Sequence, residues 1–275
     1  MKRKSVLVFS IVTAVFVLLA LGYNFISRLA DSPGTPEIHF DSEQMPQVSI
    51  TAGEQELLAG VTATDPEDGD VTASLVVQGI SRLNSDSVAT VTYAAFDSRD
   101  HVTKAERQVR FVDYVPPKFE LSDDLLFSMN DRATILNCVS ATDMVDGNVT
   151  DRVRFEMLDG SSSMNEVGIY SLQLRVTNSL GGSSVLPLTV EVTATNPNPA
   201  LITLSDYLVY LPKGSTFVAE DYIVSYRMGG TTVNTGEGIT IESDVNTNHS
   251  GVYTVTYSYE SATSLSRTRL IVVVE

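Results

Sequence analysis

The sequence is short of the residues that carry most enzyme chemistry and of those that build disulfide scaffolds. It contains one cysteine, three histidines and no tryptophan among 275 residues. Cys138 has no partner for an internal disulfide, and its apolar surroundings predict a buried, inert thiol. His39, His101 and His249 lie far apart, without the HExxH spacing of a zinc protease, and no GxSxG serine is present. We therefore expect a protein that is not an enzyme and has no cofactor.

Positive charge is also scarce. Thirty-four Asp and Glu residues oppose eighteen Lys and Arg, for a formal net charge of −16. Three of the cations, Lys2, Arg3 and Lys4, precede every acidic residue, so the rest of the chain is more acidic still. Such a surface repels nucleic acid and anionic lipid headgroups, and we expect neither as a partner.

The N-terminus has the pattern of a membrane anchor. Ser5–Ile26 contains no charged side chain; as a helix it would extend about 33 Å, enough to cross a hydrocarbon core of about 30 Å. The cations of residues 1–4 predict a cytoplasmic stub, with the remainder outside the cell membrane. Cleavage near Gly22 would instead release a secreted protein. We favour the uncleaved signal-anchor, because apolar residues continue beyond that position.

The remainder of the sequence is repetitive. Ala63–Thr72 (ATDPEDGDVT) recurs as Ala141–Thr150 (ATDMVDGNVT), with seven of ten positions identical. Val167–Val176 (VGIYSLQLRV) resembles Ser250–Tyr259 (SGVYTVTYSY). Prolines at positions 36, 117 and 199 keep the same spacing, 81 and 82 residues apart. The sequence therefore predicts a linker and three domains, over residues 27–36, 37–114, 117–195 and 199–275.

Within each predicted domain the hydrophobic pattern has a period of two. Stretches such as residues 87–94, 170–177 and 252–258 alternate, or are rich in β-branched and aromatic residues, as half-buried strands are. Gly, Asn, Asp and Pro interrupt these stretches at near-regular spacing. After residue 30 no stretch keeps helical spacing over three turns. We predict an all-β protein built from small antiparallel β-sandwiches.

The motifs resemble the immunoglobulin-like (Ig-like) repeats of bacterial surface proteins. The resemblance is carried by GVTATDPEDGDVT with DSRDHVT, by CVSATDMVDGNVT with VGIYSLQLRVTNSLGG, and by KGSTFVAEDYIVS with SGVYTVTYSY. Such repeats occur in tandem in adhesin-like cell-surface proteins and in some pesticidal crystal toxins. The resemblance implies a bacterial protein with three tandem Ig-like sandwiches. It fits Tyr170 and Tyr253, whose hydroxyls we expect to bond to the backbone just upstream, as in a tyrosine corner.

The acidic motif raises the question of a calcium site, since carboxylates in a flexible loop suit that ion. An EF-hand is excluded: counted from Asp65, glycine falls at position five and Val76 at position twelve, where glycine is required at six and glutamate at twelve. Two of the acids of the first repeat are absent from the second, which a turn tolerates better than a metal site. We expect a turn, and keep as calcium candidates Asp65, Glu67, Asp68, Asp70, Asp143 and Asp146.

These patterns favour a membrane-anchored extracellular protein that serves as an adhesion, interaction or spacer module for an unknown protein or glycan ligand. One alternative is a surface array of carbohydrate-binding modules, and another is a calcium-stabilised adhesin rod. The carbohydrate alternative predicts exposed tyrosines along one sheet face, since aromatic rings provide large contact area. The third predicted domain contains Tyr207, Tyr210, Tyr222, Tyr226, Tyr253, Tyr257 and Tyr259. We expect most of them to be core or structural, and one or two exposed ones to serve as contact residues.

Overall fold

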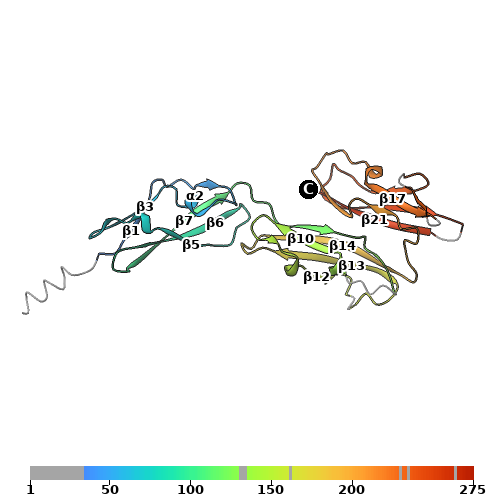
Figure 1. Cartoon of the computed structure of the whole chain (residues 1–275), viewed down its shortest axis with the longest axis horizontal. Coiled ribbons are helices and arrows are strands. Elements are labelled where there is room, and N and C mark those ends of the chain that lie inside the picture. Colours follow the sequence, from blue (N-terminus) through green and yellow to red (C-terminus); the bar gives the residue numbers. More distant parts are fainter. Residues whose placement is uncertain (1–33, 130–134, 161–162, 229–230, 234–235, 263–264) are drawn as a thin grey trace, which may run out of the picture. The chain divides into compact units, whose positions relative to one another are not determined.

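The computed structural model describes residues 34–129, 135–160, 163–228, 231–233, 236–262 and 265–275. In these segments the chain is all-β, as predicted, with α2 (Glu54–Leu57) as a single turn of α-helix (Figure 1). No helix within the described ranges has the length and apolar character needed to span a bilayer. The predicted stub (residues 1–4) and anchor (Ser5–Ile26) lie outside the described residues, as do the Gly22 cleavage point and most of the 27–36 linker.

The chain divides into two compact units. The first contains the described residues before 47 together with 53–80 and 90–109; the second contains 47–52, 81–89 and 110–275. The buried centre of the first unit includes Ala63, Val91 and Tyr93. The Tyr93 hydroxyl donates to the carbonyl oxygen of Leu57 at 2.9 Å, so the polar end of this buried ring is satisfied.

Two sheets account for the strands up to residue 111. The smaller has the order β1-β3-β4 and the larger the order β2-β7-β6-β5. The strands of the smaller sheet are β1 (Glu37–Phe40), β3 (Val61–Asp65) and β4 (Gly69–Asp70). Those of the larger are β2 (Gln47–Val48), β5 (Val76–Ile80), β6 (Val88–Phe96) and β7 (Val102–Phe111).

Residues 118–193 of the second unit repeat this arrangement. Their sheets have the orders β11-β10-β8 and β12-β13-β14-β9. The first sheet consists of β8 (Lys118–Leu121), β10 (Val139–Asp143) and β11 (Gly147–Asn148). The second consists of β9 (Leu126–Ser128), β12 (Arg154–Met157), β13 (Gly168–Thr177) and β14 (Ser183–Thr193).

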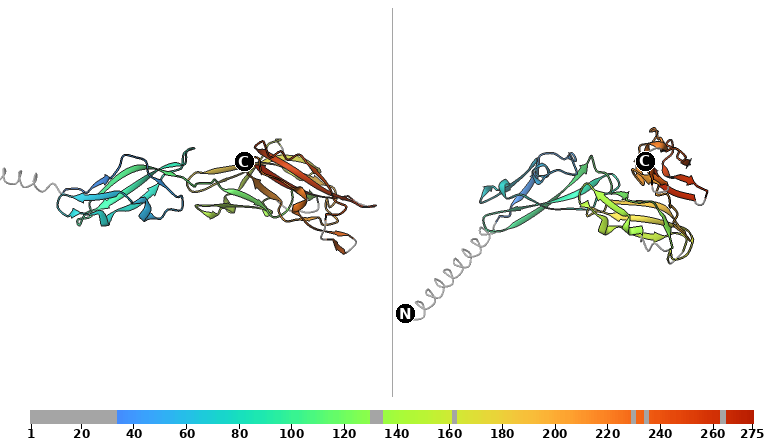
Figure 2. Two further views of the ribbon diagram at one scale, coloured as in Figure 1. Left: turned by 90° about the horizontal axis from the view of Figure 1, so that it is seen from above. Right: turned by 45° about the vertical axis from the view of Figure 1, so that its right-hand side comes forward.

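Residues 203–274 form another such pair of sheets, with the orders β15-β17-β18 and β16-β21-β20-β19. The first sheet consists of β15 (Thr203–Leu204), β17 (Ile223–Met228) and β18 (Thr231–Val233). The second consists of β16 (Leu208–Leu211), β19 (Thr240–Ser243), β20 (Gly251–Glu260) and β21 (Leu265–Val274). The strands are seen from two further directions in Figure 2.

The period-two pattern forms strands because it gives each sheet one apolar face. In β13 the side chains of Tyr170, Leu172, Leu174 and Val176 are buried, and those between them are exposed or half-buried. A shift of one residue would turn this whole apolar row toward water, so the burial fixes the register against β14.

The sheets are not purely antiparallel, which corrects the predicted antiparallel sandwich. In each four-stranded sheet a short early strand pairs parallel with the last strand: β2 with β7, β9 with β14, and β16 with β21. The preceding strand lies in the other sheet, so the chain crosses between sheets and continues beside the last strand in the same direction. We call these connecting segments crossovers; the first is Asp41–Pro46 and the second is residues 122–125.

The tyrosine corners are confirmed. The Tyr170 hydroxyl donates to the Glu166 carbonyl oxygen at 2.8 Å, and the Tyr253 hydroxyl donates to the His249 carbonyl oxygen at 2.9 Å. Each bond spans four residues and ties the start of a long strand to the turn before it.

We expect Tyr170→Phe to lower the free energy of unfolding by about 1 kcal/mol, because it deletes this hydrogen bond but keeps the ring. Tyr253→Phe should cost less, since that bond is exposed to water. Urea unfolding of both variants measures the effect, and Ser171→Ala, at an exposed position of β13, serves as the control. Equal stability of Tyr170→Phe and the parent chain would contradict the role assigned to the corner.

Candidate functional site

The acidic motif of the first repeat is the hairpin between β3 and β4. Asp65 Oδ1 accepts hydrogen bonds from the backbone N–H groups of Glu67 at 2.8 Å and Asp68 at 3.0 Å. Gly69 follows with a φ of +76°, a left-handed conformation that favours glycine. Asp70 Oδ1 accepts from the Thr72 N–H at 2.9 Å, and the hydrogen bonds from Thr72 lower the pKa of Asp70. The side chains thus organise the local backbone.

The remaining acids of this motif join the hairpin to the loop between β6 and β7. The carboxylate of Asp68 accepts from the N–H of Ser98 at 2.7 Å and from its hydroxyl at 3.0 Å. Glu67 forms an exposed ion pair with Arg99. Asp68 therefore links two loops that are thirty residues apart in the sequence.

The second repeat makes the same contacts. Asp143 Oδ1 accepts from the N–H groups of Val145 at 2.9 Å and Asp146 at 3.0 Å. The Asp146 carboxylate accepts from the N–H and the hydroxyl of Ser179, both at 2.7 Å, and pairs with Arg152. Burial alone would raise the pKa of Asp146, but these hydrogen bonds and Arg152 outweigh it and hold the pKa below its usual range.

The two repeats differ at one buried contact. Asn178 Nδ2 donates to Asp143 Oδ2 at 3.1 Å and to the Tyr114 hydroxyl at 3.0 Å. The corresponding residue of the first repeat is Asp97, which likewise precedes the serine of the loop and accepts the N–H four residues later at 2.8 Å. A carboxylate has no hydrogen to donate. Asp65 Oδ2, the counterpart of Asp143 Oδ2, is buried and has no hydrogen-bond partner.

This geometry bears on the calcium candidates. Asp65, Asp68, Asp143 and Asp146 each accept two or more backbone or hydroxyl hydrogens through their carboxylates. Within the described ranges, no three or more His, Cys, Asp or Glu side chains are grouped so that they could hold a metal ion. A calcium ion would have to displace the hydrogen bonds that shape the turns.

We therefore expect millimolar calcium to leave the melting temperature of residues 37–195 unchanged, as measured by differential scanning calorimetry. Magnesium at the same ionic strength serves as the control. A rise of several degrees with calcium but not with magnesium would contradict this expectation and support the alternative of a calcium-stabilised rod.

The cysteine and the histidines are dispersed in the structure. The Cys138 thiol is buried, donates to the Ile135 carbonyl oxygen at 3.1 Å, and has a pKa raised by burial to about 11. A thiol with this pKa is almost entirely protonated at neutral pH, so it is a poor nucleophile. His39 contacts Thr64 at 3.0 Å and His101 contacts Asp97 at 2.6 Å. Each of these two histidines thus contacts one polar side chain of its own sandwich.

The tyrosines of residues 199–275, all of which the structure describes, form no exposed strip of the kind that the carbohydrate alternative predicts. All seven tyrosines of residues 199–275 are buried or half-buried. The Tyr226 and Tyr257 rings lie in the hydrophobic core, and their hydroxyls donate to the carbonyl oxygens of Glu237 at 2.6 Å and Ala219 at 2.8 Å. In β20, Tyr253, Tyr257 and Tyr259 are separated by even numbers of residues and share the face of the buried Val255, where they pack rather than bind.

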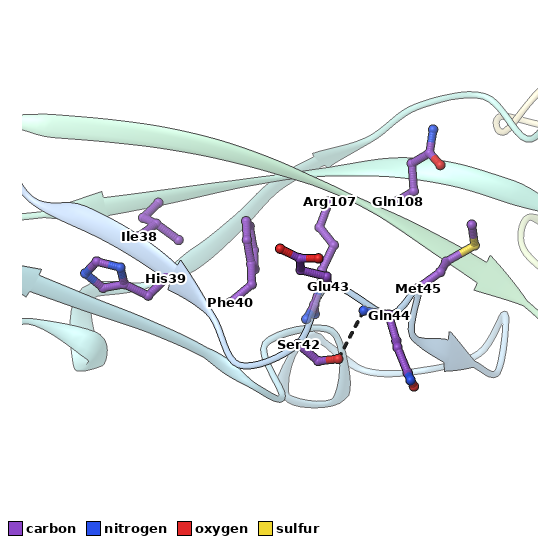
Figure 3. Close-up of a pocket in the computed structure, with 9 residues that line it drawn as sticks. All are labelled: Ile38, His39, Phe40, Ser42, Glu43, Gln44, Met45, Arg107 and Gln108. Carbon is purple, nitrogen blue, oxygen red and sulfur yellow. Dashed lines mark hydrogen bonds between the residues drawn. The ribbon is translucent and has the colours of Figure 1, made fainter.

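A groove in the first unit went unpredicted from the sequence. It has a volume of about 570 Å³ and lies between the first crossover, the end of β1 and the strand β7 (Figure 3). Its lining residues are Ile38, His39, Phe40, Ser42, Glu43, Gln44, Met45, Arg107 and Gln108. Glu43 is its single carboxylate, and it contains no nucleophile paired with a base. Such a groove suits binding rather than catalysis.

Arg107 organises the wall of this groove. Its Nη2 donates to the carbonyl oxygens of Leu57 at 3.1 Å and Ala59 at 3.3 Å, and to the Tyr93 hydroxyl at 3.1 Å. Its guanidinium lies over the Phe40 ring, 5.2 Å from the ring centre. Figure 3 shows both side chains. One feature of the sequence could have indicated this groove: Arg107 interrupts an inward-facing row of β7 whose other residues are apolar or small.

The second unit contains a buried acid that sequence reasoning also missed. Asp124 Oδ2 accepts from the Thr268 hydroxyl at 2.6 Å, and Oδ1 accepts from the Leu126 N–H at 3.2 Å. Burial raises the pKa of Asp124 to about 6, although these hydrogen bonds oppose the shift. Beside it, Arg269 Nη2 donates to the Leu125 carbonyl oxygen at 2.9 Å. Residues 144 positions apart in the sequence therefore form one polar cluster.

Comparison with known proteins identifies one segment. Residues 204–273 match the family described as bacterial surface protein, Ig-like domain, which confirms the resemblance over that segment. No curated protein matches the chain.

Several solved structures share a distant likeness. One contains a carbohydrate-binding module in complex with GlcNAc and INT domains of ZmpB from Clostridium perfringens. Its sequence is 14% identical, the match covers 57% of this chain and 41% of that chain, and the TM-score is 0.27. A lipoprotein from Bacteroides thetaiotaomicron has 15% identity over 56% of this chain and 98% of its own, TM-score 0.23. The EC21-23 segment of human CDH23 has 12% identity over 87% and 100%, TM-score 0.22. The chain spans 41% of the first of these structures, and 31% of a second ZmpB structure that contains the M60 catalytic domain with two carbohydrate-binding modules. These likenesses are too distant to bear on a ligand or an activity.

Proposed function

We propose that this chain is a bacterial cell-surface protein, anchored by Ser5–Ile26, that displays three tandem Ig-like β-sandwiches and acts by non-catalytic contact. The N-terminus would be cytoplasmic and the sandwiches extracellular, serving as an adhesion, interaction or spacer module. The sandwiches would comprise residues 37–114, 117–195 and 199–275.

The observation that carries the proposal is the family match over residues 204–273. The sheet orders support its extension to the preceding residues, since each of the three pairs of sheets combines a three-stranded sheet with a four-stranded sheet that contains one parallel pair. The acidic motifs support the absence of catalysis, because their carboxylates are engaged in the turns.

A protein ligand is favoured over a glycan. A carbohydrate-binding face needs accessible aromatic rings, and the tyrosines of residues 199–275 are packed inside or at the edge of one of two hydrophobic clusters. The groove of the first unit has one aromatic residue, Phe40, and the guanidinium of Arg107 lies over its ring.

An epitope tag after Glu275 tests location and anchoring in a bacterial host. We expect the tag to be cleaved by protease added to intact cells, while the protein stays with the membrane fraction through carbonate extraction. A cytoplasmic protein of the same cells is the control for lysis. A tag protected in intact cells would overturn the proposed topology, and a protein released into the medium would support cleavage near Gly22.

Residues 31–275 test the mode of action. Immobilised on beads, they should retain envelope or surface proteins in a salt-sensitive manner and give no signal on a glycan array. Strong, saturable binding of one glycan class would overturn the protein-contact proposal in favour of the carbohydrate alternative.

A further inference from the structure

The groove of the first unit corresponds to a surface that is covered in the second unit. The parallel strands fix the correspondence: Gln47 lies opposite Arg110 in one sheet, and Leu126 lies opposite Glu191 in the other. Counting back along β7 and β14, Arg107 and Gln108 of the groove therefore correspond to Leu188 and Thr189.

In the second unit, β20 and β21 cover this surface. Leu188 and Thr189 line a pocket together with Val252, Thr254 and Ile271. The adjacent crossover is held by two hydrogen bonds, from Thr268 to Asp124 and from Arg269 to the Leu125 carbonyl oxygen. A β-strand region from elsewhere in the chain is thus seated where the first unit has its groove.

The first crossover leaves more space beside its last strand than the second crossover does. It has six residues, Asp41–Pro46, against the four of residues 122–125. Leu125 of the shorter crossover is 1% exposed and fills the space beside β14, whereas Met45 of the longer one is 38% exposed. No described segment of the first unit covers the groove.

The groove borders an open sheet edge. β2 pairs with β7 at Arg110 and Phe111, so from Val102 to Val109 this side of β7 has no strand partner among the described residues. Backbone N–H groups alternate between the two sides of a strand. The N–H of Val112 points to the β2 side, where it donates to Val48 at 3.1 Å. By the same alternation, the N–H groups of Lys104, Glu106 and Gln108 point to the open side.

The charge beside this edge is net positive, in a chain whose net charge is −16: Lys104, Arg107 and Arg110 of β7 outnumber Glu106 of β7 and Glu43 of the groove. Lys104 is exposed on β7, and Arg107 lines the groove. Neither forms an ion pair with a carboxylate of the described residues. The groove therefore favours a ligand that brings its own carboxylates.

We propose that the groove and the open edge of β7 form a docking site for an extended, acidic segment of a partner protein. The segment adds as a strand beside Lys104–Gln108, with main-chain hydrogen bonds supplying affinity and its carboxylates facing Lys104 and Arg107. This deepens the proposed function, on which it rests, by naming the kind of partner that the first sandwich takes.

A second copy of the chain fits less well. In the second unit, Arg267 and Arg269 of β21 face acceptors that include Glu191, which pairs with Arg267 at 2.8 Å. By register the counterpart of Glu191 in the first sandwich is Arg110, and that of Asp124 is Met45. The strand that seats on the second sandwich would therefore find neither carboxylate on the first.

Two synthetic peptides test the proposal. Each has nine residues of alternating valine and threonine. One carries two glutamates three positions apart, so that one lies on each face as Lys104 and Arg107 do, and the other carries two lysines at the same positions. Titration of the full chain in detergent micelles is followed by fluorescence anisotropy of the labelled peptide. We expect at least tenfold tighter binding of the glutamate peptide, together with slower hydrogen exchange in residues 102–109.

Variants of β7 separate strand addition from adventitious attraction. Gln108→Pro removes an N–H on the open side, where proline is tolerated at a sheet edge, and should weaken binding at least tenfold. Gln108→Ala keeps the N–H and should bind at least tenfold more tightly than Gln108→Pro. Lys104→Glu should reverse the preference between the two peptides without affecting the fold, which circular dichroism checks.

Several results would overturn the proposal. These are equal binding by the Gln108→Pro and Gln108→Ala variants, no slowing of exchange in residues 102–109, or displacement of the peptide by chitohexaose, which would identify a glycan groove. Protection of residues 102–109 by self-association without peptide would identify a second copy as the occupant. A failure of the cell-surface topology would leave the peptide result standing, so the two failures are distinguishable.

Discussion

Asn178→Asp is expected to lower the free energy of unfolding of the second unit by about 3 kcal/mol at pH 7. The substitution removes the two N–H donations to Asp143 Oδ2 and to the Tyr114 hydroxyl. It also places a carboxylate beside Asp143, and both positions are buried, at 5% and 9% exposure. Urea unfolding measures the loss. The loss should shrink at pH 4, because a protonated carboxyl at position 178 could donate again.

The first repeat offers the reverse substitution as a matched control. Asp97→Asn supplies an N–H donor at the position that corresponds to Asn178, and by that correspondence we expect it to reach the buried, unpartnered Asp65 Oδ2. We expect it to raise the free energy of unfolding by about 1 kcal/mol. The second N–H of the introduced asparagine can donate to Nδ1 of His101, the atom that contacts the Asp97 carboxylate in the parent chain. Destabilisation by both substitutions would show that the two repeats do not share this contact.

The second unit is also expected to lose up to about 3 kcal/mol through Asp124 as the pH rises from 4 to 8. Burial raises the pKa of this carboxyl to about 6 in the folded chain, against about 3.9 for an unfolded aspartate. The folded state therefore holds the proton more tightly. The protonated Asp124 carboxyl therefore contributes its full share to the free energy of unfolding below pH 4, and this share is lost as the pH rises through 6.

Asp124→Asn isolates this contribution from the titration of other acids. An asparagine keeps Oδ1 for the Leu126 N–H and can donate to the Thr268 hydroxyl through Nδ2. We expect the variant to match the parent chain near pH 4 and to exceed it in stability at pH 8. Urea midpoints at intervals of half a pH unit give the two curves. Parallel curves would contradict the assignment, and would mean that Asp123 or Arg269, the charged groups beside Asp124, compensates its ionisation.

Features that depend on neighbouring residues could be predicted from the sequence. Period-two alternation is enough to predict strands such as β13, because successive side chains of a strand point to opposite faces. The turn after β3 follows from Asp65 and Gly69, since an aspartate can bond the next backbone N–H groups and glycine accepts a positive φ. The tyrosine corner of Tyr170 spans only four residues and could be predicted for the same reason.

Features that depend on distant residues were decided by the tertiary structure. The sequence does not indicate that Asp124 meets Thr268, or that β2, β9 and β16 lie parallel to the last strands of their sheets. The groove forms where the six-residue first crossover passes Arg107 of β7. Neither the length of the crossover nor the presence of the arginine predicts it alone. Local patterns set which segments form strands and turns. Burial, an unpaired carboxylate and an open sheet edge arise only when segments far apart in the chain pack together.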